Sequence, residues 1–151
     1  MSGQVARAGL AYFALVFGAG FVLGPLRILF LVPRVGERAA ELLELPVMVG
    51  LSWLAARWVT RRLAVPSSTG ARLGMGVLAG ALLLGAEFAL VLPLRGLTLA
   101  EYLATRDPVA GTAYYAAVLL MVLMPLAVRG VAKGDRGAAA RADRSSLSRR
   151  P

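Results

Sequence analysis

The chain contains neither cysteine nor histidine among its 151 residues. Without cysteine there can be no disulfide, no thiolate nucleophile and no cysteine-ligated metal. Without histidine the commonest general base, the usual haem ligand and most zinc sites are also excluded. The isolated hydroxyls of Ser52 and Thr112 have no base beside them in the sequence. We therefore expect a protein that is not an enzyme and that holds no cofactor and no metal.

Charged residues are also scarce, at 17% of the chain, whereas 58% of the residues are hydrophobic and the mean hydropathy is +0.71. Ordinary soluble domains are about 45–50% apolar. Small domains leave much of their surface exposed, so a chain of this length cannot hide such an excess in an aqueous core. The composition predicts that lipid is the solvent for part of the surface.

Four apolar runs are long enough to cross a hydrocarbon layer of about 30 Å as helices of about 20 residues. They are Leu10–Val32, Leu42–Val59, Leu73–Leu94 and Val109–Val128. The runs do not alternate between apolar and polar residues as the strands of a membrane barrel do. The first run exceeds the 7–15 apolar residues of a secretory signal, so we expect it to be an uncleaved span. The sequence predicts an all-α polytopic membrane protein, with a four-helix up-down bundle over residues 1–129.

The net charge of +9 is unevenly distributed over the predicted connections. Twelve of the 17 basic residues fall in the N-terminal segment, the middle connection with the end of the second span, and the C-terminal tail. Basic residues in short connections stay on the cytoplasmic side. Trp53 and Trp58 fit an aromatic belt at that side. We expect both termini to be cytoplasmic in a multi-pass protein of the cell inner (plasma) membrane, as in many small bacterial proteins.

The C-terminal segment 130–151 is rich in arginine and has almost no large apolar residue. Such a composition predicts a disordered basic cytoplasmic tail. Basic tails beside a span are attracted to anionic lipid, by about 1 kcal/mol for each lysine or arginine near the surface. Nucleic acid is not an expected partner, because no aromatic residue is interleaved with the basic ones.

Two charged residues fall well inside predicted spans, away from the span ends: Arg27 in the first and Glu87 in the third. Both spans run outward in the predicted topology, and at 1.5 Å per residue the two residues lie roughly 8 and 10 Å from the outer ends. Pairing within the bundle relieves the cost of a charge in lipid. We therefore predict an intramembrane ion pair between Arg27 and Glu87. The alternatives are that Arg27 extends to the outer headgroups, or that Glu87 belongs to a proton or cation pathway.

Three acidic residues in the segment Pro33–Pro46, which leads into the second span, share one helical stripe: Glu37, Glu41 and Glu44. Their spacing of i, i+4 and i+7 places them on one face of a helix. A solvated face leading into the second span is the simplest interpretation. The sharper alternative is an outer acidic vestibule, formed with Glu87, that attracts cations.

Small residues recur at four-residue spacing in the first and third spans. The pairs are Gly20 with Gly24, Gly70 with Gly74, and Gly76 with Gly80. Glycines at this spacing let helix backbones approach closely where lipid removes the hydrophobic driving force. With the predicted ion pair, they favour close packing of the first span against the third. A homodimer through the third span is the alternative.

Two classes of function are consistent with these features. The first is a small integral membrane protein without catalytic machinery that acts by packing, as an accessory subunit or a small homo-oligomer. Its partners would be the lipid bilayer and other copies of the chain or another membrane protein. The second is an oligomeric transporter or channel for protons or cations that uses Glu87 and the outer acidic stripe.

Overall fold

The computed structural model describes residues 2–96 and 98–128, and this part of the chain is 89% helical without strands. Four helical segments in it are long and apolar enough to cross a membrane. The elements in chain order are α1 (Gly3–Leu26), η1 (Arg27–Leu31), α2 (Val32–Val35), α3 (Glu37–Arg62), α4 (Thr69–Arg95), α5 (Leu99–Thr105) and α6 (Pro108–Ala127). The predicted tail, residues 130–151, lies outside the described residues.

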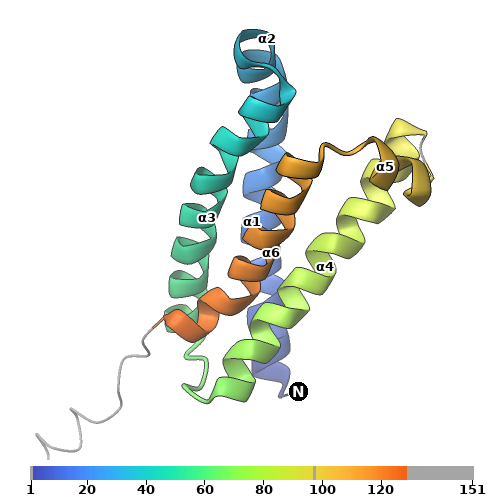
Figure 1. Ribbon diagram of the computed structural model, residues 1–151. Coiled ribbons are helices and arrows are strands. Elements are labelled where there is room, and N and C mark those ends of the chain that lie inside the picture. Colours follow the sequence, from blue (N-terminus) through green and yellow to red (C-terminus); the bar gives the residue numbers. More distant parts are fainter. Residues whose placement is uncertain (1, 97, 129–151) are drawn as a thin grey trace, which may run out of the picture.

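Consecutive long helices run in opposite directions (Figure 1). We call the end with residues 3–7, 60–72 and 121–128 the basal end, and the end with residues 27–44 and 87–110 the distal end. Helix α1 makes its most extensive contacts with α4, and α6 packs against both α3 and α4. The close packing of the first span against the third, expected from the sequence, is confirmed.

The first long segment is longer than the sequence predicted, because α1, η1 and α2 form one continuous helical stretch over Gly3–Val35. Its middle element is a π-helical turn, in which the Val32 N–H donates to the Arg27 carbonyl five residues earlier. This turn lies between Pro25 and Pro33. Each proline removes a backbone donor and disturbs the regular ladder, which favours a local change of helical pitch.

A single residue, Gly36, connects α2 to α3. Its φ of +82° lies in the region that side chains disfavour, so glycine is the residue that fits this turn. The chain reverses there and forms a tight hairpin at the top of the view in Figure 1. We refer to α1 through α3 as the first hairpin, and to α4 through α6 as the second hairpin.

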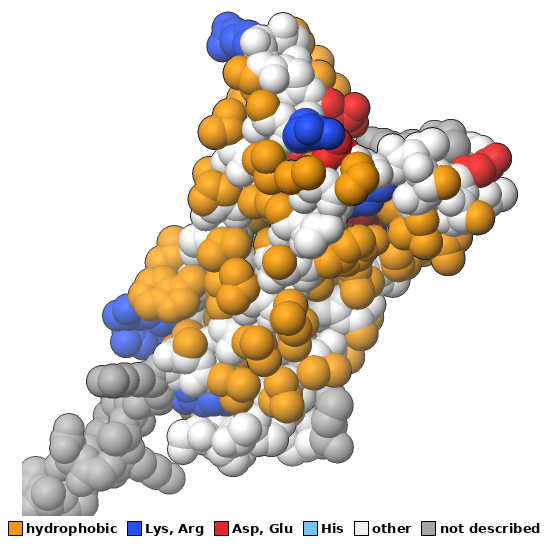
Figure 2. All heavy atoms as spheres, viewed as in Figure 1, with side chains coloured by type: hydrophobic (Ala, Val, Ile, Leu, Met, Phe, Trp, Pro, Cys, Tyr) orange, Lys and Arg blue, Asp and Glu red, His pale blue; other side chains and the backbone are white. Residues whose placement is uncertain are grey.

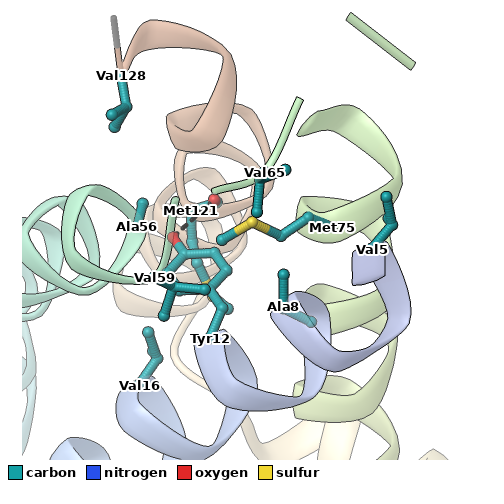
Figure 3. Packing of buried hydrophobic residues seen from close by; sticks show 11 residues of the cluster. Val5, Ala8, Tyr12, Val16, Ala56, Val59, Val65, Met75, Met121 and Val128 are labelled. Atoms are coloured by element: carbon teal, nitrogen blue, oxygen red, sulfur yellow. Dashed lines mark hydrogen bonds between the residues drawn. The ribbon is translucent and has the colours of Figure 1, made fainter. Parts of the chain in front are cut away.

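The hydrophobic core lies in the basal half of the bundle and is centred on Tyr12, which is fully buried. The Tyr12 hydroxyl donates to the Met121 carbonyl at 2.9 Å (Figure 3). Pro125 follows four residues later and has no N–H, so this carbonyl has lost its usual helical donor. Tyr12 therefore replaces the missing hydrogen bond and joins α1 to α6. The core members are Val5, Ala8, Tyr12, Val16, Ala56, Val59, Val65, Met75, Ala79, Met121 and Val128.

We expect Tyr12→Phe to lower the free energy of unfolding by about 1–2 kcal/mol, because the buried Met121 carbonyl would lose its donor. The measurement is reversible unfolding in mixed detergent micelles. Tyr115→Phe is the matched control, since the Tyr115 side chain is exposed and its ring is retained. Equal losses for the two variants would show that the hydroxyl of Tyr12 has no special role.

Side chains from other helices cover the carbonyl ends of α3 and α6 at the basal end. The Gln4 amide donates to the carbonyls of Leu63, at 2.7 Å, and Ala64, at 3.0 Å. The buried guanidinium of Arg72 donates to the Pro125 carbonyl at 3.2 Å. The last carbonyls of a helix have no partner within the helix, so these bonds satisfy them and fix α1 to α3 and α4 to α6.

The predicted glycine packing is only partly where the sequence placed it. Gly74 does face the first span, because a Cβ there would lie 3.4 Å from the Val5 side chain. Gly20 faces α3 instead, where the Met48 methyl would lie 3.5 Å from an added Cβ. The closest glycine contact between α1 and α4 is at Gly9, which lies outside the predicted glycine pairs and packs against Leu78.

The remaining selected glycines also depart from the prediction. Gly76 and Gly80 both pack α4 against Val122 of α6. Gly24 and Gly70 have nothing within 4 Å of an added Cβ. The four-residue spacing thus correctly predicted close helix packing at several of these glycines, but it did not indicate which neighbouring helix packs there. The physical reason is that α4 presents different faces to α1 and α6, and both contacts require small residues.

Candidate functional site

Arg27 forms an ionic cluster with two glutamates of α3. Its Nη1 lies 3.1 Å from a carboxylate oxygen of Glu41, and its Nε lies 3.1 Å from one of Glu44. The side chain of Arg27 is only 17% exposed. An arginine between two carboxylates is favourable in a poorly solvated place, because the planar guanidinium presents several donors and stays charged. We call Arg27, Glu41 and Glu44 the first cluster.

The three residues of the predicted acidic stripe do not act together. Glu41 and Glu44 face Arg27 within the first hairpin. Glu37 is exposed and lies in the first turn of α3, where a negative charge interacts favourably with the helix dipole. Two of the three carboxylates therefore contact Arg27, which balances one of their two charges, and this argues against an open acidic vestibule.

Glu87 lies in a second cluster with two tyrosines and an arginine. One carboxylate oxygen accepts a hydrogen bond from Tyr102 at 2.6 Å and lies 3.4 Å from Nη1 of Arg106. The other accepts a hydrogen bond from Tyr114, and Arg106 also donates to the Tyr102 hydroxyl. The side chains of Glu87 and Arg106 are 17% and 16% exposed. We call Glu87, Tyr102, Arg106 and Tyr114 the second cluster.

Three elements of the second hairpin bring the second cluster together. Helix α4 ends at Gly96, a left-handed residue with φ of +62°, and α5 then packs back against α4. Helix α5 begins with a capping box, in which Thr98 and Glu101 each satisfy the other's backbone N–H. Tyr102 and Arg106 are four residues apart, so both side chains can reach Glu87 from this short helix and its end.

Aromatic rings surround the guanidinium of Arg106. Its carbon lies 4.6 Å from the ring centroid of Tyr114, 5.3 Å from that of Tyr102 and 5.7 Å from that of Tyr115. A cation over aromatic faces is attracted by the ring quadrupole, and the attraction grows as water is excluded. The rings therefore help to hold Arg106 next to Glu87.

An exposed ion pair joins the two hairpins at the distal end. Arg38 Nε lies 2.7 Å from the carboxylate of Asp107, which also caps the start of α6. The backbone N–H of Ala110 and the Arg38 side chain lower the pKa of Asp107. Hydrogen bonds from Thr98 likewise lower the pKa of Glu101. Both carboxylates thus favour the charged form in the folded protein.

These lowered pKa values predict an acid-labile distal end. A carboxylate whose pKa falls on folding stabilises the folded state above its unfolded pKa, and this contribution is lost as the pH falls through the folded value. We expect stability in detergent to be insensitive to these two groups near pH 7 and to decline below about pH 4. The Glu101→Gln/Asp107→Asn double variant should show a smaller decline in thermal unfolding scans. An unchanged acid profile in this variant would contradict the assignment.

The predicted pair between Arg27 and Glu87 is not the pairing found. Arg27 contacts Glu41 and Glu44, whereas Glu87 contacts Arg106. Each charge has a partner within its own hairpin. The partners of Arg27 lie 14 and 17 residues away in the chain, whereas Glu87 lies 60 residues away. The nearer partners require less ordering, since a shorter segment closes between the two side chains.

The sequence contains a signal for each of the two observed contacts, that of Arg27 with Glu44 and that of Glu87 with Arg106. Arg27 and Glu44 lie nine and eight residues from Gly36, so a tight reversal at this glycine places them at similar heights. For Glu87, the signal was the four-residue spacing of Tyr102 and Arg106. Tyr102, Arg106 and Tyr114 were not predicted as partners of Glu87. The first two fall in the connection after the third span and Tyr114 falls in the fourth span, where no repeated pattern points to Glu87.

The chemistry available to the clusters is charge compensation and hydrogen bonding. In the described part of the chain no three side chains of the metal-ligating acidic types lie together. Ser52 is buried, and the Thr112 hydroxyl donates to the Pro108 carbonyl at 2.7 Å. Within residues 2–96 and 98–128, neither hydroxyl is hydrogen-bonded to a carboxylate.

Comparison of the chain with protein-family models, with curated proteins and with solved structures finds no match in any of the three. The conclusions on function therefore rest on the residues and their geometry.

Proposed function

We propose that the chain is a multi-pass membrane protein without catalytic machinery that acts by packing, as an accessory subunit or a small oligomer. The observation that carries this proposal is that Arg27 and Glu87, the two charges predicted inside the membrane, each have an oppositely charged partner inside their own hairpin. The compensated clusters need no ligand for their stability. The outer surface of the helices is therefore the part of the protein that is available to bind a partner.

Large apolar side chains are exposed on every long helix, and hydrophobic side chains are spread over the face in Figure 2. Examples are Phe21 and Leu29 in the first segment, Leu54 in α3, Val77 in α4 and Leu119 in α6. In water such a surface would aggregate. Lipid, or the apolar face of another membrane protein, can cover this apolar surface.

The separation of charge supports an orientation. All six acidic residues of the described part, from Glu37 to Asp107, lie at the distal end. Arg7, Arg61, Arg62 and Arg72 lie at the basal end, and Arg57 lies about one turn from it, against five arginines at the distal end. The seven basic residues of 129–151 follow α6 in the sequence and raise the basal total to twelve. By the excess of basic residues on the cytoplasmic side, we propose that the basal end and both termini face the cytoplasm of the plasma membrane. The basic segment 130–151 would then meet anionic lipid rather than nucleic acid.

The absence of cysteine makes this orientation easy to test. We expect Ser67→Cys, in the basal connection, to react with a membrane-impermeant maleimide only after cells are permeabilised. Ala104→Cys, on the exposed side of α5, should react in intact cells. The wild-type chain is the control, since it has no thiol to label. The opposite labelling pattern would contradict the proposed orientation.

The packing function is tested by reconstitution. Proteoliposomes with the full chain should show no proton or cation flux above that of empty liposomes. Sedimentation in detergent should show a defined oligomer, or a monomer if the partner is another membrane protein. Flux that depends on the protein would contradict the proposal.

A transport function is the second candidate, favoured by the hydrogen-bonded network around the partly exposed Glu87. Intramembrane acids often belong to proton or cation pathways. If this candidate is right, Glu87→Gln should abolish flux while the protein still folds. The contact with Arg106 counts against it, because a cation is already in place beside the carboxylate.

A further inference from the structure

The outward face of α3 carries an open groove of about 540 Å³ at its basal end. Three arginines and two apolar side chains line it: Leu54, Arg57, Trp58, Arg61 and Arg62. Basic side chains lie directly beside hydrophobic ones in this part of the surface (Figure 2). The groove plays no part in either cluster of the distal end.

The arginines of the groove have no carboxylate partner in the described part of the chain. The ion pairs found there involve Arg27, Arg38 and Arg106, all at the distal end. Arg57 lies over the ring of Trp53, 5.3 Å from its centroid. The groove therefore concentrates uncompensated positive charge beside aromatic rings, and an anion is the ligand that would balance it.

An exposed apolar stripe leads along α3 into the groove. Val47, Leu54 and Trp58 are separated by seven and four residues, so they lie on one face of the helix, and all three are exposed. From Val47 to Trp58 the helix rises about 16 Å. This length matches one leaflet, which is about half of a 30 Å hydrocarbon layer.

We propose that the groove binds one anionic phospholipid. Its phosphate would lie among Arg57, Arg61 and Arg62, and an acyl chain would follow Leu54 and Val47. Guanidinium groups suit phosphate because their donors match two of its oxygens. The inference rests on the membrane location proposed above, but not on the packing function.

A segment of the same chain is a poorer occupant. Residues 129–151 contain seven basic and two acidic residues, so the tail has the same sign of charge as the groove. A free phosphate would satisfy the arginines but would leave the apolar stripe uncovered. The phospholipid is the ligand that matches both parts.

Tryptophan fluorescence can report on this site directly, because Trp53 and Trp58 are the only two tryptophans and both lie at the groove. The full chain is reconstituted into phosphatidylcholine vesicles. Increasing fractions of the lipid are replaced by brominated phosphatidylglycerol in one series and by brominated phosphatidylcholine in the other. Bromine quenches only the tryptophans that its acyl chain contacts, so the two curves give the relative affinity of the site.

We expect phosphatidylglycerol to be favoured over phosphatidylcholine by about fivefold or more, from the attraction of each basic residue for anionic lipid. In the Arg57→Gln/Arg61→Gln/Arg62→Gln variant the preference should fall to about one. The matched control is Arg141→Gln/Arg144→Gln/Arg149→Gln, which removes the same charge from the tail. It should keep the preference of the wild type.

Equal quenching by both lipids in the wild type would show ordinary lipid contact only and would overturn the proposal. So would a preference that survives the groove variant and disappears in the tail variant. Absence of quenching by either lipid would instead contradict the membrane location. The experiment therefore distinguishes failure of the proposed lipid site from failure of the proposed membrane location.

Discussion

Replacing Gly76 with alanine is expected to lower the free energy of unfolding by about 3 kcal/mol, at the upper end of the usual cost of overpacking. A Cβ at this position would overlap the carbonyl oxygen of Val122 and lie 2.9 Å from its carbonyl carbon. These are backbone atoms of α6, so no side chain can rotate away. The helices α4 and α6 would have to separate, and the contact that closes the second hairpin would weaken. Reversible unfolding in mixed micelles measures the loss.

The chain offers two controls for this prediction. Gly85 lies in the same helix with nothing within 4 Å of an added Cβ, so Gly85→Ala should be neutral or slightly stabilising through higher helix propensity. Gly80→Ala would meet the Val122 side chain at 2.5 Å. Val122→Ala should therefore rescue Gly80→Ala but not Gly76→Ala. Rescue of both, or a loss at Gly85 as large as at Gly76, would contradict the backbone contact.

Replacing Arg106 with methionine is expected to cost about 3 kcal/mol of stability, because it leaves the Glu87 carboxylate in the bundle without a cation. The hydroxyls of Tyr102 and Tyr114 would still donate to Glu87, but they cannot balance its charge. Adding Glu87→Gln should restore much of the loss, since the neutral amide needs no counterion. Thermal unfolding of the single and double variants in detergent measures both effects.

Arg38→Met is the matched control for Arg106→Met. Arg38 also pairs with a carboxylate, that of Asp107, but it does so on an exposed surface where water screens the interaction. We expect a much smaller loss of stability there than at Arg106. Similar losses of stability at the two arginines, or no rescue by Glu87→Gln, would show that burial does not determine how much the second cluster contributes to stability.

The sequence predicted the four long helices because their apolar runs satisfy a strong requirement, the burial of a helix about 20 residues long in hydrocarbon. It also predicted the contact between the first and third spans, to which Gly74 contributes by packing against Val5, although the closer contact of Gly9 with Leu78 was not predicted. These features depend on residue types that recur along one helix. Such patterns can be recognised without knowledge of the neighbours.

The partners of the buried charges could not be found in the same way. Matching Arg27 to Glu87 by depth used only the distance of each residue from the end of its span. The actual partner of Arg27 depends on the one-residue reversal at Gly36, and that of Glu87 depends on α5 packing back against α4. Both are properties of short connections, whose geometry is set by one or two residues and leaves little periodic signal.

The central claim is that Arg27 and Glu87 are each paired within their own hairpin and not with each other. Double-mutant cycles test it most directly, because they isolate the coupling between two side chains from the cost of each change. One cycle combines Arg27→Met with Glu44→Gln, and the other combines Arg27→Met with Glu87→Gln. All variants are compared by reversible unfolding in the same micelles.

We expect a coupling of about 1–3 kcal/mol between Arg27 and Glu44, as for residues in contact, and one within about 0.5 kcal/mol of zero between Arg27 and Glu87. A large coupling between Arg27 and Glu87, with none between Arg27 and Glu44, would contradict the account.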